Sequence, residues 1–156
     1  MKRTLLLLTI VLISTITSAQ KGSDEQELKN LVGTLQKAWN SGAGETFASA
    51  FAEPHDFIVW NGYYFKNNTV QKLFYVIDKI KFLKEEIALL HILGAVAPKD
   101  EARPKDPEVL ITMIVEKKNG NWKIVSFHNL DLEVFQNEKM LKSAPAPPSV
   151  MYASWY

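Results

Sequence analysis

The chain has 156 residues, with 18 Lys and Arg against 17 Asp and Glu, and it contains no cysteine. A formal net charge of +1 without a basic stripe argues against nucleic-acid binding. The lack of cysteine excludes disulfides, thiolate metal sites and a cysteine nucleophile. The length suits a single domain with one core, which the 47% of hydrophobic residues can supply.

The N-terminal residues follow the pattern of a cleavable secretory signal. Lys2 and Arg3 precede an apolar run from Leu5 to Ile13, and small residues then lead to a cleavage site with Thr17 and Ala19 at its recognised positions. The apolar run is shorter than the roughly 20 residues that cross a bilayer. We therefore expect cleavage after Ala19, export to the periplasm or out of the cell, and no membrane anchor after cleavage.

Three segments follow from this organisation: a signal peptide over 1–19, a domain over 20–142 and a tail over 143–156. Prolines stiffen the start of the tail, and large apolar side chains including Trp155 follow them. Those side chains would otherwise stand in water, so we expect the tail to dock onto the domain or onto its partner.

Helices are expected first in the domain. A capping box formed by Ser23 and Gln26 begins the first helix, and apolar residues at three-and-four spacing continue it to Trp39. A second helix is expected over 45–52. A third is expected to start at Asn67 or Asn68 and to extend over the apolar residues up to position 77.

Strands are expected afterwards, over 56–60, 80–83, 87–96, 109–117 and 122–134. Asn61-Gly62 and Asn119-Gly120 are hairpin signals, and 97–107 is a proline-containing loop. Helices followed by antiparallel strands indicate an α+β domain with helices on one side of a sheet. The long strands are apolar on both faces, so the second face needs cover from a partner subunit or from the tail.

Three segments in order resemble a known superfamily: LQKAWN with FASAF (35–51), DFIVWNG (56–62) and NGNWKIVSFHN (119–129). Their order and spacing resemble the nuclear transport factor 2-like superfamily, in particular the SnoaL-like proteins of the SgcJ/EcaC branch, over residues 24–134. The resemblance implies a cone-shaped curved antiparallel sheet wrapped around the N-terminal helices, with an internal pocket and commonly a dimer. Members include isomerases, dehydratases, cyclases and binding modules, so the fold alone does not determine the function.

Ketosteroid isomerase, a member of this superfamily, can be aligned through the same segments. Its general base then falls on Val59, and its two oxyanion donors fall on Leu35 and Ile114. Proton abstraction beside a carbonyl needs a base and a donor, which aliphatic side chains do not supply. The resemblance therefore argues against this chemistry.

The same alignment implies which residues face the pocket. We expect the lining to consist of Trp39, Phe57, Val59, Asn61, His91, Thr112, Ile114, Phe127 and Asn129, with Leu93 and Asp131 on the same face. His91 and Asp131 are the candidate catalytic residues, because an imidazole near a carboxylate can perform acid–base chemistry. The alternative is that His91 is a core histidine bonded to a strand carbonyl.

Other sites and partners are predicted by elimination. Three histidines and no cysteine make a metal site a poor prediction, and no cofactor is expected because the sequence has no glycine-rich phosphate loop or dinucleotide fingerprint. The opposite sheet face is expected to carry an apolar patch that forms a homodimer, consisting of Ile111, Met113, Val115 and Ile124. Three functions remain open: binding of a small, largely apolar ligand, acid–base catalysis with His91 and Asn129 or Asp131, and protein interaction.

Overall fold

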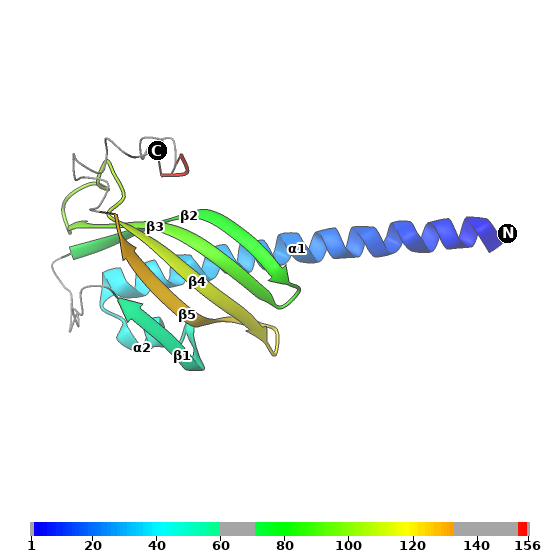
Figure 1. Ribbon diagram of the computed structural model, residues 1–156, viewed down its shortest axis with the longest axis horizontal. Coiled ribbons are helices and arrows are strands. Elements are labelled where there is room, and N and C mark those ends of the chain that lie inside the picture. Colours follow the sequence, from blue (N-terminus) through cyan, green and yellow to red (C-terminus); the bar gives the residue numbers. More distant parts are fainter. Residues whose placement is uncertain (1, 60–70, 133–152, 156) are drawn as a thin grey trace.

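The computed structural model describes residues 2–59, 71–132 and 153–155. Two helices come first, α1 (Lys2–Ser41) and α2 (Gly44–Ala48). Five strands follow in the chain: β1 (Phe51–Val59), β2 (Gln71–Lys84), β3 (Ile87–Pro98), β4 (Val109–Lys118) and β5 (Asn121–Asp131). They form one sheet in the order β1-β5-β4-β3-β2, which curves around α1 (Figure 1). The expected α+β architecture, a curved sheet wrapped around an N-terminal helix, is confirmed.

The pairing of β1 corrects one part of that expectation. Strands β2 to β5 pair in antiparallel fashion along the sheet. β1 runs parallel to β5, with Phe57 beside Phe127 and Val59 beside Asn129. The sheet is therefore mixed rather than antiparallel, and β1 forms the edge opposite β2.

Helix α1 is longer than the capping box predicted. It runs without interruption from Lys2, so Ser23 lies inside the helix and its hydroxyl donates to Glu27 at 3.5 Å instead of capping a first turn. Among residues 20–41 of α1, the apolar side chains in the core are Leu28, Val32, Leu35 and Ala38. Cleavage after Ala19 stays a prediction, and it would leave these packing residues in place. Within the described ranges, no helix has the length and apolar character needed to cross a membrane.

The third predicted helix is wrong, because residues 71–84 form strand β2. Leu73, Phe74 and Ile77 match helical spacing only because both faces of this strand are apolar. Phe74 pairs with Ala95 on one face, and Ile77 pairs with Ile92 on the other. A run rich in aromatic and β-branched residues favours a strand once a neighbouring strand is present to pack against. The predicted 80–83 strand is the continuation of β2, whereas Asn61-Gly62, Asn67 and Asn68 lie outside the described residues.

The predicted hairpin between β4 and β5 is confirmed, and it contains a bulge that the sequence did not reveal. Asn119 and Gly120 have φ values of 52° and 78°, as a two-residue type I′ turn requires. Farther from the turn, Val115 pairs with Ile124 but Ile114 pairs with Ser126, so Val125 has no counterpart on β4. An extra residue of this kind reverses the face on which the following residues lie.

Because of the bulge, the side chains of β3 and β4 lie on the opposite faces of the sheet from those predicted. Without it, Thr112 and Ile114 would share a face with Phe127. With it, Met113 pairs with Phe127 and Ile111 pairs with Asn129. The four residues assigned to an exposed dimer patch are instead core residues with at most 1% exposure that pack with α1: Ile111, Met113, Val115 and Ile124. A homodimer stays a prediction, but the patch that suggested it lies in the core.

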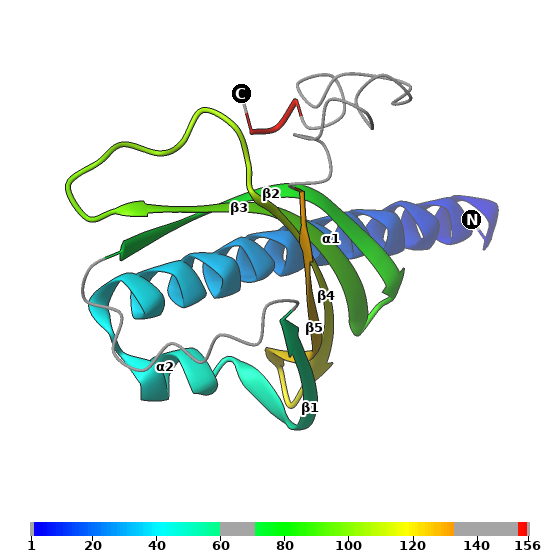
Figure 2. The same cartoon turned by 60° about the vertical axis from the view of Figure 1, so that its left-hand side comes forward.

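A second, smaller core lies on the sheet face that points away from α1. Leu93 and Ala95 of β3 pack there with Leu132 and Trp155, and each of these four residues is at least 95% buried. Figure 2 shows the C-terminal segment (red) on the opposite side of β2 and β3 from α1. The prediction that the tail docks onto the domain is confirmed for residues 153–155.

Candidate functional site

An aromatic cluster joins α1, α2, β1 and β5 on the inner face of the sheet. We define it as Trp39, Phe47, Phe51, Phe57 and Phe127. The Phe47 ring lies at its centre, with its centroid 6.0 Å from Trp39, 5.6 Å from Phe51 and 6.5 Å from Phe57. Phe57 stacks on Phe127 at 4.7 Å and 23°. Phe127 is 3% exposed whereas Phe57 is 44% exposed, so the cluster leads from the core to solvent.

Asn129 places a polar group beside this cluster. It lies two residues beyond Phe127 on β5, which puts both side chains on one face about 6.6 Å apart. Its cross-strand neighbours are Ile111 and the backbone of Val59. The Oδ1 atom is buried and has no hydrogen-bond partner within the part of the chain that the structure describes. A buried acceptor without a partner costs about 1–3 kcal/mol, so this oxygen is suited to receive a donor from a bound molecule.

Two titratable groups lie on the next cross-strand row of the same face. Tyr75, Gly94, Val109 and Asp131 follow one another across four strands. The Tyr75 ring covers Gly94, where an added Cβ would lie 3.1 Å from the ring and 2.8 Å from Val109 Cγ2. Burial raises the pKa of the Tyr75 phenol above its usual range, which keeps the group neutral. The half-buried Asp131 ends the row beside Asn129.

The structure brings together only part of the predicted pocket lining. Trp39, Phe57 and Phe127 meet in the aromatic cluster, and Asn129 lies next to it on the same face. The backbone of Val59 pairs with Asn129. Asn61 lies outside the described residues. The described positions, without Asn61, form one region, and their role in binding a ligand stays a prediction.

The other predicted lining residues lie on the outer face, which corrects their expected orientation. His91 pairs with Thr112, and Thr112 pairs with His128, so these three form a row facing away from α1. Ile114 and Leu93 lie on the same outer face, the latter in the second core. The physical reason is the bulge at Val125, because each strand paired beyond it takes the opposite orientation.

This placement removes the geometric basis for catalysis by His91. Asn129 and Asp131 pair with Ile111 and Val109 on the inner face, whereas His91 lies on the outer face. The sheet therefore separates the imidazole from both proposed partners. Asp131 keeps its inner position, but the acid–base pair built on His91 is not formed.

Sequence reasoning missed two contributors to this region. Phe51 was placed in a helix, yet it begins β1 and contacts Phe57 at 5.5 Å and Phe127 at 6.2 Å. His55 also lies in β1, outside the predicted 56–60 strand, with its ring 4.9 Å from the Phe51 ring and its Nδ1 2.7 Å from the Ala52 carbonyl oxygen. The β1 register against β5 shifts between Phe51 and Asp56, so the strand is interrupted there and this irregularity could not be predicted from the sequence pattern.

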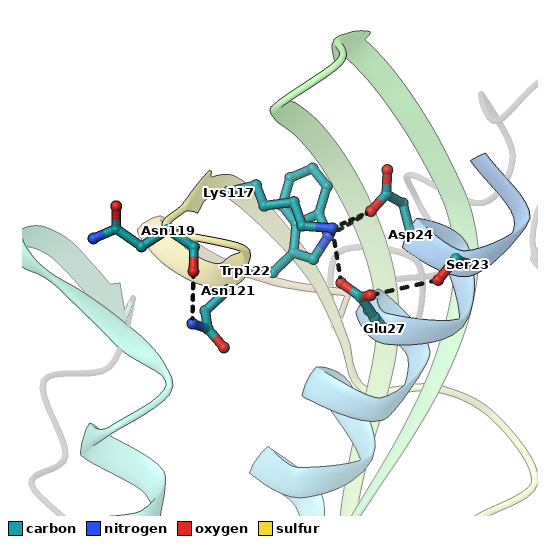
Figure 3. Close-up of polar contacts among 7 residues, drawn as sticks. All are labelled: Ser23, Asp24, Glu27, Lys117, Asn119, Asn121 and Trp122. Carbon is teal, nitrogen blue, oxygen red and sulfur yellow. Dashed lines mark hydrogen bonds and ion pairs between the residues drawn. The ribbon is translucent and has the colours of Figure 1, made fainter. Parts of the chain in front are cut away.

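A polar cluster ties α1 to the β4–β5 hairpin at the other end of the core (Figure 3). Lys117 Nζ lies 2.5 Å from Asp24 Oδ1 and 3.0 Å from Glu27 Oε2. The Trp122 indole also donates to Asp24 Oδ1 at 3.4 Å. Asp24 is only 4% exposed, so its buried carboxylate depends on these donors. The cluster connects α1 to the hairpin, because Lys117 pairs with the carboxylates of both Asp24 and Glu27.

The Lys117 cluster predicts a loss of stability at alkaline pH. The hydrogen bond to Asp24, opposed by partial burial and aided by Glu27, raises the pKa of Lys117. A raised folded-state pKa gives stability that is complete below the unfolded value of about 10.4 and disappears as pH rises through the folded value. Lys117→Met should therefore lower the free energy of unfolding by about 1–3 kcal/mol at pH 7, a difference that shrinks above about pH 10.

Lys118→Met is the matched control for this pH series. The Lys118 side chain is 63% exposed and pairs with Glu116 at 2.9 Å on the surface, so its loss should cost under about 1 kcal/mol at every pH. Urea unfolding at stepped pH measures both variants. The role assigned to Lys117 is contradicted if the loss of unfolding free energy in Lys117→Met persists unchanged to pH 12. It is also contradicted if this loss equals that of Lys118→Met.

The described residues contain no candidate metal site. Among residues 2–59, 71–132 and 153–155, no three His, Asp or Glu side chains converge in a way that would hold an ion. The described part of the inner face offers aromatic contact, the Asn129 amide acceptor, and the flanking Tyr75 and Asp131.

Comparisons with known proteins identify the fold. No family model matches the sequence, and no curated protein matches it. A domain with a cystatin-like fold from Nostoc punctiforme superposes with a TM-score of 0.62 and 23% identity, covering 84% of this chain and 93% of that domain. A hexachlorocyclohexane dehydrochlorinase of type 2 superposes with a TM-score of 0.60 at 9% identity, covering 74% and 89%.

An NTF-2 like protein of unknown function from Shewanella oneidensis superposes with a TM-score of 0.52 and 21% identity, covering 69% of this chain and 99% of that protein. Identities at this level show a common fold, and the SgcJ/EcaC branch stays a prediction. These structures have the fold that the resemblance of the three sequence segments implied. This chain therefore has the nuclear transport factor 2-like fold.

Proposed function

We propose that this protein is an exported binding domain that holds a small, largely apolar ligand against the aromatic cluster, with Asn129 as the polar contact. One observation carries the proposal: the Asn129 Oδ1 atom is buried without a partner, next to Phe127 and to the solvent-exposed ring of Phe57. Small-molecule sites commonly combine apolar walls with a few placed polar groups. Export rests on the signal-like N-terminus.

The neighbours of Asn129 define the chemistry of this ligand. Its cross-strand row continues through the aliphatic Ile111, Ile92 and Ile77, and Phe127 stands beside it on β5. Aromatic rings offer flat faces for stacking, which favours a planar molecule. An amide oxygen accepts hydrogen bonds and cannot donate one, so the ligand should carry a hydroxyl or N–H group at its edge.

Binding is favoured over isomerase-type proton abstraction. The bulge turns Ile114 outward, but the β4 residues that replace it on the inner face, Met113 and Val115, are equally unable to donate a hydrogen bond. Leu35 is buried in the core. The inner face of β4 therefore offers no oxyanion donor at the positions that the alignment with ketosteroid isomerase identifies.

The proposal predicts a preference between two matched probes, 1-naphthol and 1-methoxynaphthalene. Both present the same ring system, but only 1-naphthol donates a hydrogen bond. Wild-type protein should bind 1-naphthol more tightly by about three- to tenfold, as expected for one net hydrogen bond. Asn129→Leu, which keeps the number and branching of the side-chain heavy atoms, should remove the preference while leaving the fold intact, as measured by isothermal titration calorimetry and thermal unfolding.

Asn121→Leu serves as the control, because Asn121 lies exposed beside the hairpin turn with its amide bonded to the Asn119 carbonyl. This variant should keep the preference of the wild type. A wild-type protein that binds neither probe, or an Asn129→Leu protein with an undiminished preference, would refute the proposed role of Asn129.

A further inference from the structure

The outer sheet face holds a second binding arrangement, which is occupied by the protein's own Trp155. We call it the Trp155 seat. The indole is 1% exposed despite its place in a C-terminal tail. Its apolar walls come from β2, β3, β4 and the residue after β5: Phe74, Val76, Leu93, Ala95, Leu110 and Leu132.

The polar contacts of the seat are specific to a tryptophan in a peptide. The indole Nε1 donates to the Lys105 carbonyl oxygen at 3.0 Å. Arg103 donates from Nη2 to the Trp155 carbonyl oxygen at 2.8 Å, and its guanidinium lies 4.7 Å from the indole ring centroid. Ser154 Oγ donates to Asp78 Oδ1 at 2.5 Å. Ring, backbone and preceding side chain are thus each bound by a different group.

The frame of the seat is held by contacts that do not involve Trp155. β2, β3 and β4 are paired along their lengths. Glu108 connects the loop before β4 to this frame, since its N–H donates to the Gly94 carbonyl at 2.9 Å and its Oε2 accepts from Val96 N–H at 3.0 Å. Leu132 N–H donates to the Glu108 carbonyl at 2.8 Å. These backbone and side-chain contacts of the frame do not depend on Trp155.

We propose that the Trp155 seat is a peptide-binding site whose resident ligand is the Ala153–Trp155 segment, and that it binds the same segment supplied as a separate peptide. In this proposal Trp155 is both a member of the second core and a tethered ligand. A ligand joined covalently to its site is held at an effective concentration of about 1 mM. Occupancy of about 90% by the tail then requires a dissociation constant below about 0.1 mM for the free peptide.

The test uses the full chain carrying Trp155→Ala, which empties the seat, and an acetylated, amidated and dye-labelled peptide with the sequence of residues 149–156. Fluorescence anisotropy should show binding to Trp155→Ala with a dissociation constant below about 0.1 mM. Wild-type protein, with its seat filled, should bind at least about tenfold more weakly because its own tail competes. A peptide with alanine in place of tryptophan should not bind.

A second variant distinguishes specific binding at the Trp155 seat from nonspecific binding of the peptide. Arg103→Ala added to Trp155→Ala removes the stacking cation and the donor to the peptide carbonyl, so it should weaken peptide binding by about tenfold or more. Circular dichroism confirms that each variant is folded. The proposal is overturned if the peptide does not bind to folded Trp155→Ala, or if it binds equally to the wild type and to Trp155→Ala. It is also overturned if Arg103→Ala leaves the affinity for the peptide unchanged.

Discussion

Replacing Met113 by glutamate is expected to unfold the protein or to lower its free energy of unfolding by at least about 4 kcal/mol. Met113 has no exposed surface and lies among residues that pack against α1. A carboxylate at this position has no partner and must either stay charged in an apolar core or be protonated. Because domains of this size are stable by only about 5–15 kcal/mol, much of the population should lose its native structure.

Thr112→Glu is the matched control, one residue away on the opposite face. Thr112 is half-buried on the outer face between His91 and His128, where a carboxylate can reach solvent and imidazoles. We expect a change within about 1 kcal/mol. Urea unfolding decides between the two faces. A folded Met113→Glu protein with a disrupted Thr112→Glu protein would mean that the inner and outer faces of β4 are reversed.

Replacing Trp155 by alanine is expected to lower the free energy of unfolding by about 1.5–3 kcal/mol, the value of burying one large apolar side chain. For a domain of this length that corresponds to a fall in melting temperature of about 5–10 °C. The effect follows from the burial of the indole in the second core and from its bonds to Lys105 and Arg103. A chain ending at Lys142 should fall by a similar amount.

Ser154→Ala tests whether the indole or the tail as a whole is responsible. Ser154 is exposed and contributes one hydrogen bond to Asp78, so its replacement should change the melting temperature by only a degree or two, roughly as expected for an exposed bond. If Trp155→Ala melts at the wild-type temperature, the indole does not contribute to the fold. Calorimetry of the wild type, Trp155→Ala, Ser154→Ala and the chain ending at Lys142 gives this comparison directly.

Local signals in the sequence predicted much of the fold. The Asn119-Gly120 turn and the alternation of the long strands placed β3, β4 and β5 within a few residues of their observed bounds. These features depend on neighbouring residues in the chain. β2 was mistaken for a helix because Leu73, Phe74 and Ile77 fit both periods, and only the presence of β3 as a pairing partner decides between them.

The candidate site was predicted in part, for a related reason. Trp39, Phe57, Phe127 and Asn129 were assigned to the inner face and do lie there. No sequence pattern predicts the extra residue at Val125. It nevertheless reverses the face on which the side chains of β4 lie relative to Phe127, and through strand pairing it also reverses those of β3. One bulge therefore accounts for the misplacement of His91, Thr112 and Ile114 together.

The most direct test of the proposed binding site is to locate a bound probe by nuclear magnetic resonance. Isotope-labelled wild-type protein is titrated with 1-naphthol while backbone, side-chain amide and indole signals are followed. We predict that the largest shifts occur at the Asn129 side-chain amide, at Phe127 and Phe57, and at the Trp39 indole. Shifts centred on His91, Thr112 and Ile114 of the outer face, or no saturable shifts at all, would contradict this account.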